Sequence, residues 1–126
     1  MKLSNLLIIN AILTLIYGIG FVLVPAAVWS IYGMTPSPGM SLAGQFFGVA
    51  LIGIGLVTWF ARNVVDSAAQ RAIILGLLIA DVVGIIVAVL GTLSGVMNAV
   101  GWSAVGIYLL LALGYAYFQF AKPSAS

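Results

Sequence analysis

Residues 71–94, RAIILGLLIADVVGIIVAVLGTLS, form an apolar run in which Asp81 is the only charged side chain after the opening arginine. At about 1.5 Å of rise per residue, a helix of this length crosses the roughly 30 Å hydrocarbon core of a bilayer. Polar and apolar residues do not alternate along the run, as they would in a membrane-spanning strand. The stretch therefore predicts a transmembrane α-helix that carries a carboxyl group near its midpoint.

Three further apolar runs predict spans at about 3–24, 41–61 and 98–120. Together with 71–94 they make a single all-α domain over residues 1–126, a polytopic four-transmembrane-helix bundle. Hydrophobic residues are 64% of the chain and charged residues only 5%, whereas soluble domains contain about a quarter charged residues. Such a chain cannot cover a water-facing surface, so the lipid bilayer is the expected partner and nucleic acid is not.

The uncharged segment after the first span predicts a helix of a different kind. Pro25 ends the span, because proline cannot continue the hydrogen bonding of a helix. Residues 26–32 predict a short helix in the headgroup region, with Trp29 and Tyr32 as interfacial anchors. The apolar run at 6–24 is longer than that of a usual signal peptide, so we expect it to be an uncleaved span.

All the basic side chains fall on one side of this four-span arrangement. The positive-inside rule makes that side cytoplasmic. Both termini and the loop between the second and third spans are therefore expected in the cytoplasm, in a multi-pass protein of a prokaryotic plasma membrane. The same loop is expected to cap the third span through Asp66 or Ser67. The basic residues are Lys2, Arg62, Arg71 and Lys122.

Small residues recur every four positions in the third predicted span, and a shorter series lies in the second. Small residues at this spacing let helix backbones approach closely, which is how membrane helices pack. We favour packing within the monomer, because four spans already need internal contacts. A homo-oligomer or docking interface is the alternative. The residues are Gly76, Ala80, Gly84 and Ala88 in the third span, and Gly44 and Gly48 in the second.

Polar side chains gather at mid-depth in several spans. A carboxylate in hydrocarbon is costly, so Asp81 is expected to be protonated or hydrogen bonded inside the bundle. Gly84 and Ala88 share its helix face, which indicates that it points toward another helix. Two interpretations stay open: a functional group, or a hydrogen bond that joins helices. The other members of this candidate intramembrane cluster are Asn10, Thr14, Tyr17 and Tyr108.

Several kinds of chemistry are excluded by composition. The chain has no Cys and no His, so it has no disulfide, thiol redox centre, Cys/His zinc site or His-ligated haem. Its two acidic residues are too few for a good oxygen-ligand metal cage. Phosphate-binding and nucleophile-elbow motifs are absent, and a Ser–His–Asp arrangement is impossible. We expect no metal, no cofactor and no catalytic residue, and hence not an enzyme.

Packing and turn residues follow one another along the first two spans at Gly18, Gly20, Pro25, Tyr32, Gly33, Gly48, Gly55 and Trp59. Their order resembles that of small four-span bacterial and archaeal membrane proteins grouped as DoxX-like. The resemblance implies a four-helix membrane bundle over most of the chain. Some DoxX-related proteins accompany quinone-linked oxidoreductases. The resemblance carries over no catalytic residue.

Three functions follow as hypotheses. The first is a non-catalytic subunit or scaffold of a larger membrane complex, or a self-associating bundle. The second is an oligomeric carrier or channel that uses Asp81 for a proton or a small solute. The third is the binding of a lipid, a quinone or another apolar molecule between helices, with Asp81 or Tyr108 hydrogen bonded to its polar head.

Overall fold

The computed structural model describes residues 2–121, and this part of the chain is helical, with no strand. Four long helices are each apolar enough to cross a membrane, as in a multi-pass membrane protein, and a short helix follows the first. The predicted all-α class is therefore confirmed. The elements are α1 (Leu3–Leu23), α2 (Pro25–Ile31), α3 (Pro38–Ala61), α4 (Ser67–Leu93) and α5 (Gly101–Ala116), which continues as the π-helical turn η1 (Tyr117–Ala121).

Two of the long helices begin earlier than predicted, because polar side chains cap them. α3 begins before residue 41, since the Ser37 hydroxyl accepts a hydrogen bond from the backbone N–H of Met40 at 3.2 Å. α4 begins before residue 71, at the predicted cap, since the Asp66 carboxylate accepts a hydrogen bond from the backbone N–H of Ala69 at 3.0 Å. Each cap satisfies a backbone donor that the first helical turn leaves without an intrahelical partner.

α5 begins later than the predicted residue 98, because Asn98 belongs to the preceding turn. Its side-chain oxygen accepts a hydrogen bond from the backbone N–H of Val100 at 3.0 Å. Its side-chain nitrogen donates to the backbone oxygen of Ile31, at the end of α2, at 3.2 Å. Asn98 therefore holds the α4–α5 turn to α2.

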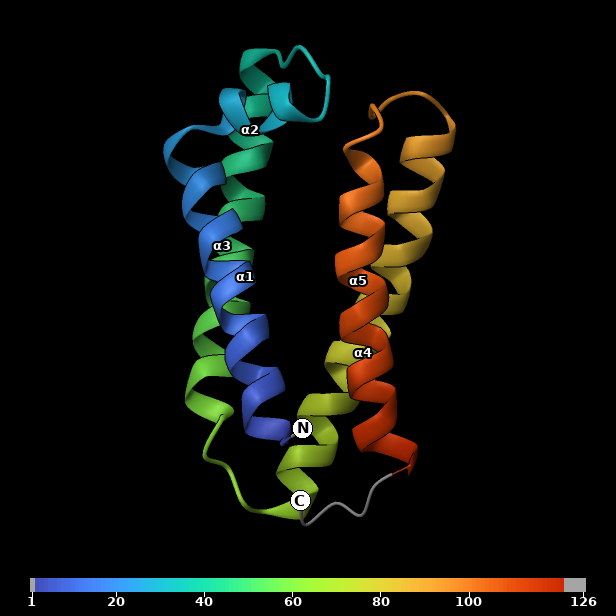
Figure 1. Cartoon of the computed structure of the whole chain (residues 1–126). Helices are drawn as coiled ribbons and strands as arrows, with labels where there is room; N and C mark the ends of the chain where they lie inside the picture. Colours follow the sequence, from blue (N-terminus) through green and yellow to red (C-terminus); the bar gives the residue numbers. More distant parts are fainter. Residues whose placement is uncertain (1, 122–126) are drawn as a thin grey trace.

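The helices form two hairpins, which stand side by side in Figure 1. α1 packs along α3, and α4 packs along α5. The first pair approaches very closely: a Cβ atom on Gly48 would lie 2.6 Å from the backbone oxygen of Gly18, so only glycine fits there. Such close approach between backbones is the usual role of small residues in membrane helices.

The two hairpins meet at the end that carries the basic residues, here called the basic end. Lys2 and Arg62 line one surface depression there, and Arg71 lies in the first turns of α4. Figure 1 shows the N-terminus and the α3–α4 connection at this lower end. Lys122 lies outside the described residues. Buried side chains from both hairpins form one core at this end: Leu3, Leu6, Leu7, Ala61, Ile74, Leu111, Tyr115 and Phe118.

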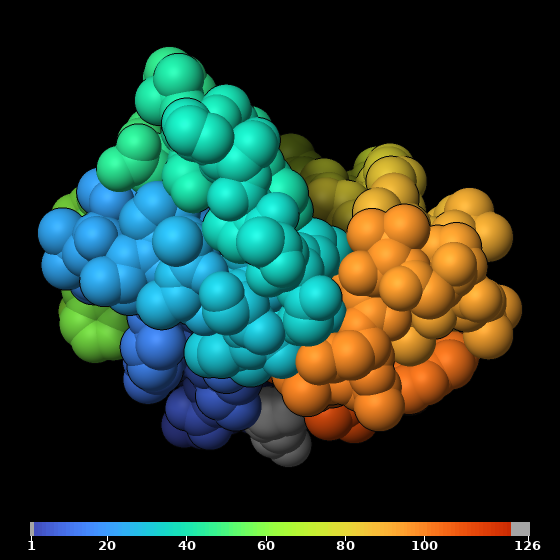
Figure 2. Space-filling model, turned by 90° about the horizontal axis from the view of Figure 1, so that it is seen from above, coloured from blue at the N-terminus to red at the C-terminus, as the bar shows by residue number. Residues whose placement is uncertain are grey.

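The hairpins meet again at the opposite end, where α2 reaches the α4–α5 turn (Figure 2). Besides its side-chain bond to Ile31, Asn98 donates its backbone N–H to the backbone oxygen of Tyr32 at 2.9 Å. Gly33 has a φ of +82° and packs against the Asn98 side chain, so a side chain there would be both strained and crowded. The hairpins are thus joined at both ends.

Candidate functional site

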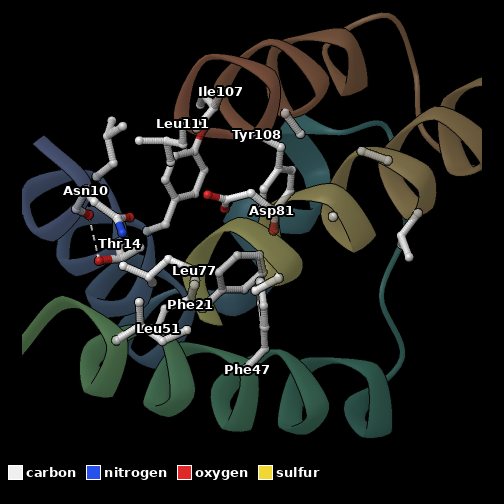
Figure 3. A pocket seen from close by; sticks show the side chains of 18 of the residues that line it. Asn10, Thr14, Phe21, Phe47, Leu51, Leu77, Asp81, Ile107, Tyr108 and Leu111 are labelled. Carbon is white, nitrogen blue, oxygen red and sulfur yellow. Dashed lines mark hydrogen bonds between the residues drawn. The ribbon is translucent and has the colours of Figure 1, made fainter. Parts of the chain in front are cut away.

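A cavity of about 370 Å³ lies between the two hairpins and reaches the end where α2 meets the α4–α5 turn. Side chains from α1, α2, α3, α4 and α5 line it, and most of them are apolar. Figure 3 shows apolar side chains such as Leu51, Leu77 and Leu111 around it. This volume lies within the range of ligand pockets, which are usually apolar clefts with a few convergent polar groups.

Asp81 supplies the one acidic side chain of the lining. Its side chain is only 8% exposed, and its Oδ2 atom is buried without a hydrogen-bond partner. In Figure 3 it points away from α4 into the space among the labelled side chains. A buried polar atom without a partner is uncommon in proteins and costs about 1–3 kcal/mol, more for a charged group. The Oδ2 atom of Asp81 is therefore a buried acceptor that no described group satisfies.

The structure brings all five members of the predicted polar cluster to this cavity, since Asn10, Thr14, Tyr17, Asp81 and Tyr108 all line it. Three of them, Asn10, Thr14 and Tyr17, already have hydrogen-bond partners. The Thr14 hydroxyl donates to the backbone oxygen of Asn10 at 2.8 Å, as the dashed line in Figure 3 shows. Their polar groups are thus less available to a ligand than that of Asp81.

Tyr115, which lies on α5, was missed as a partner of the cluster. The Asn10 side-chain nitrogen donates to the Tyr115 hydroxyl at 2.8 Å, and the Tyr115 side chain is completely buried. This hydrogen bond joins α1 to α5, so it helps to hold the two hairpins together at the basic end of the cavity. The sequence placed Tyr115 near a helix end, where an aromatic residue usually belongs to the interfacial belt.

Aromatic rings line the part of the cavity nearest α2. Phe21 packs edge-on against Trp29, with ring centroids 4.9 Å apart, and against Phe47, at 5.1 Å. Tyr32 is 8% exposed and lies 3.4 Å, oxygen to oxygen, from the hydroxyl of Tyr17. The predicted interfacial anchors on and after α2 therefore turn inward and line the cavity.

Tyr32 lies beyond the end of α2, outside the long helices. Burial, with a smaller effect of its hydrogen bond to Tyr17, raises the pKa of Tyr32 to about 12. The Tyr32 phenol is therefore neutral at physiological pH. It presents an uncharged ring to the cavity.

Some members of the small-residue series pack against a neighbouring helix, and others face open space. Gly84 packs against Tyr108, because a Cβ atom there would lie 2.6 Å from the Tyr108 ring, and Ala88 is buried. Gly44 packs against Trp29 in the same way, and Gly48 against Gly18. Gly76 and Ala80 differ: both are exposed, Gly76 has nothing within 4 Å of a Cβ position, and Ala80 lines the cavity. The expected packing within the chain is not formed at Gly76.

The cavity is half open, and its exposed lining residues lie on α3 and α4. Phe47 and Ile54 of α3 are 42% and 38% exposed, and Val87 of α4 is 63% exposed. On the opposite wall, Asn10 of α1 and Leu111 of α5 are 3% and 6% exposed. The opening therefore lies between α3 and α4, on the apolar flank of the molecule.

Within residues 2–121, no group of three His, Cys, Asp or Glu side chains is placed to hold a metal ion. The polar chemistry of the cavity thus rests on one carboxyl group, three phenols, an amide, a hydroxyl and an indole N–H. Compared with known protein families, curated proteins and solved structures, the chain matches none of them.

Proposed function

We propose that this chain is a non-catalytic membrane protein that binds one small, mainly apolar molecule between its two hairpins. One observation carries the proposal: Asp81 Oδ2 is buried without a partner in a half-open cavity of about 370 Å³. A pocket of this size with a mainly apolar lining and a single carboxyl group suits a ligand that is apolar over most of its surface.

Two observations weigh against the other two hypotheses: the unbonded carboxyl group of Asp81 and the buried core at the basic end. A carboxyl group that served only to join helices would be bonded within the bundle, as the Asn10 amide is bonded to Tyr115. A carrier needs a path across the membrane, whereas a buried core that includes Leu7 and Ile74 fills the space between the hairpins at the basic end. Ligand binding needs no bond from Asp81 to another helix and no open path across the membrane. It also gives Asp81 a partner.

The position of the opening suggests how the ligand arrives. Because the cavity opens between α3 and α4, beside exposed apolar side chains such as Val87, the ligand reaches it from the lipid. We further propose that the basic end, which carries Lys2, Arg62 and Arg71, faces the cytoplasm of a prokaryotic cell, following the positive-inside rule.

Native mass spectrometry of the protein, released from its own membranes in a mild detergent, tests this function. We expect one small molecule per chain, because the cavity offers one carboxyl group. Ala80→Trp should remove this molecule, since Ala80 lines the open side of the cavity and an indole would fill it. Gly76→Trp is the matched control, on the same helix face but with open space around it.

Two results would contradict the proposal. One is wild-type protein with no bound mass and an empty organic extract. The other is an assembly with different chains that keeps its composition in Ala80→Trp, which would favour the scaffold hypothesis instead.

A further inference from the structure

We propose that the molecule bound in the cavity is a lipophilic organic cation with a single positive charge, of the quaternary ammonium type. This inference rests on the proposed function and names the class of its ligand. The carboxyl group of Asp81 would supply the opposing charge, and the surrounding aromatic rings would supply the rest of the contact.

The charge balance of the cavity is the first argument. Asp81 is the only ionisable group of either sign in the lining apart from the phenols, and no Lys or Arg lines it. The described basic residues at 2, 62 and 71 belong to the basic end, whereas Asp81 lies near the middle of α4. A buried carboxyl group either keeps its proton or is ionised beside a cation, and no side chain of the lining supplies that cation. One carboxylate matches one positive charge.

The aromatic content of the lining is the second argument. Six aromatic side chains border the cavity, and they come from α1, α2, the turn after α2, α3 and α5. Aromatic ring faces attract cations, most strongly where water is excluded, and quaternary ammonium groups are commonly held in this way. The six are Tyr17, Phe21, Trp29, Tyr32, Phe47 and Tyr108.

The scarcity of free hydrogen-bonding groups is the third argument. Thr14 and Asn10 already bond within the protein, and the hydroxyls of Tyr17 and Tyr32 bond to each other. This leaves the Tyr108 hydroxyl beside Asp81. The Trp29 indole nitrogen has no partner, but it packs against α3, since a Cβ atom on Gly44 would lie 2.7 Å from it. A sugar or a peptide would leave its own polar groups unsatisfied here. A quaternary ammonium has no hydrogen-bond donor to satisfy, and it offers Asp81 an opposing charge in place of a hydrogen bond.

A matched pair of probes separates charge from shape. Phenyltrimethylammonium and tert-butylbenzene have nearly the same size and shape, and they differ by one positive charge. Equilibrium dialysis against purified protein in mild detergent, corrected for empty micelles, measures the binding of each. We expect the cation to bind wild-type protein at least about tenfold more tightly than its neutral counterpart, the scale of one desolvated cation–ring contact.

Three variants test which residues cause the tighter binding of the cation. Asp81→Asn keeps the shape of the side chain and should weaken binding of the cation at least about tenfold. Asp66→Asn should leave it unchanged, because Asp66 caps α4 outside the cavity. Phe47→Leu keeps an apolar side chain but removes one ring. It should therefore weaken binding of the cation several-fold and change binding of the neutral probe little.

The outcomes distinguish this inference from the function on which it rests. Equal binding of the two probes, with no effect of Asp81→Asn on the cation, would overturn the cation assignment. A bound neutral molecule in native mass spectrometry would overturn it as well and leave the proposed function standing. If no molecule is bound in native protein and neither probe binds, both proposals fall.

Discussion

Replacing Gly48 by leucine is expected to destabilise the protein by about 3 kcal/mol or more, because it forces α1 and α3 apart. A Cβ atom on Gly48 would lie 2.6 Å from the backbone oxygen of Gly18 and 2.9 Å from Cβ of Phe21. Neither atom belongs to a flexible side-chain end, so the helices themselves must separate. Reversible unfolding in mixed micelles of mild detergent and dodecyl sulfate, followed by circular dichroism, measures the loss.

Gly53→Leu is the matched control for this prediction. Gly53 lies on the same helix and has nothing within 4 Å of a Cβ position. Leucine at this position should therefore change the free energy of unfolding by no more than about 0.5 kcal/mol. Equal stability of the two variants would contradict the close packing of α1 on α3.

Replacing Asp81 by leucine is expected to stabilise the protein by about 2 kcal/mol while it abolishes ligand binding. The substitution removes a buried carboxyl group whose Oδ2 atom has no partner, and an acidic residue at the centre of a transmembrane helix costs about 2.5–3.5 kcal/mol. Part of this gain is offset because leucine must fit the lining. A gain in stability with a loss of function is typical of residues that serve a site rather than the fold.

The other aspartate should respond in the opposite direction. Asp66→Ala removes the cap on α4, whose carboxylate accepts a hydrogen bond from Ala69, and should cost about 1 kcal/mol. Unfolding in the same mixed micelles compares the two variants. If Asp81→Leu instead destabilises the protein by about 2 kcal/mol or more, the Asp81 side chain forms a hydrogen bond that joins two helices. Its carboxyl group is then not free to bind a ligand in the cavity.

The membrane spans were predictable because their length is fixed by the bilayer and not by other parts of the chain. The first residues of the helices were less predictable than the spans, because each depends on the hydrogen bond of one capping side chain. Ser37 extends α3 backward through a bond that a window of hydropathy does not reveal, whereas the Asp66 cap of α4 could be predicted from the residue type and its place in the loop. Asn98 instead delays the start of α5, because its side chain bonds to Val100 in the turn and to Ile31 at the end of α2.

The candidate site was predictable only in part. Depth along each span brought Asn10 and Asp81 to the same level, and the structure places both at one cavity. Three features depend on how the hairpins meet: the cavity itself, the inward turn of Tyr32, and the bond from Asn10 to Tyr115. The spacing of small residues also could not tell Gly84, which packs on Tyr108, from Gly76 in open space.

The role of Asp81 is tested most directly by the infrared absorption of its own carboxyl group. The chain has two acidic residues, so in Asp66→Asn protein Asp81 is the only side-chain carboxyl. Difference spectra are recorded between protein with its native bound molecule, protein stripped by organic extraction and refolded, and stripped protein with phenyltrimethylammonium added. We predict that the Asp81 band changes on stripping and that the cation brings out the band of the ionised carboxylate. The same Asp81 band in all three samples would contradict a ligand at this carboxyl group.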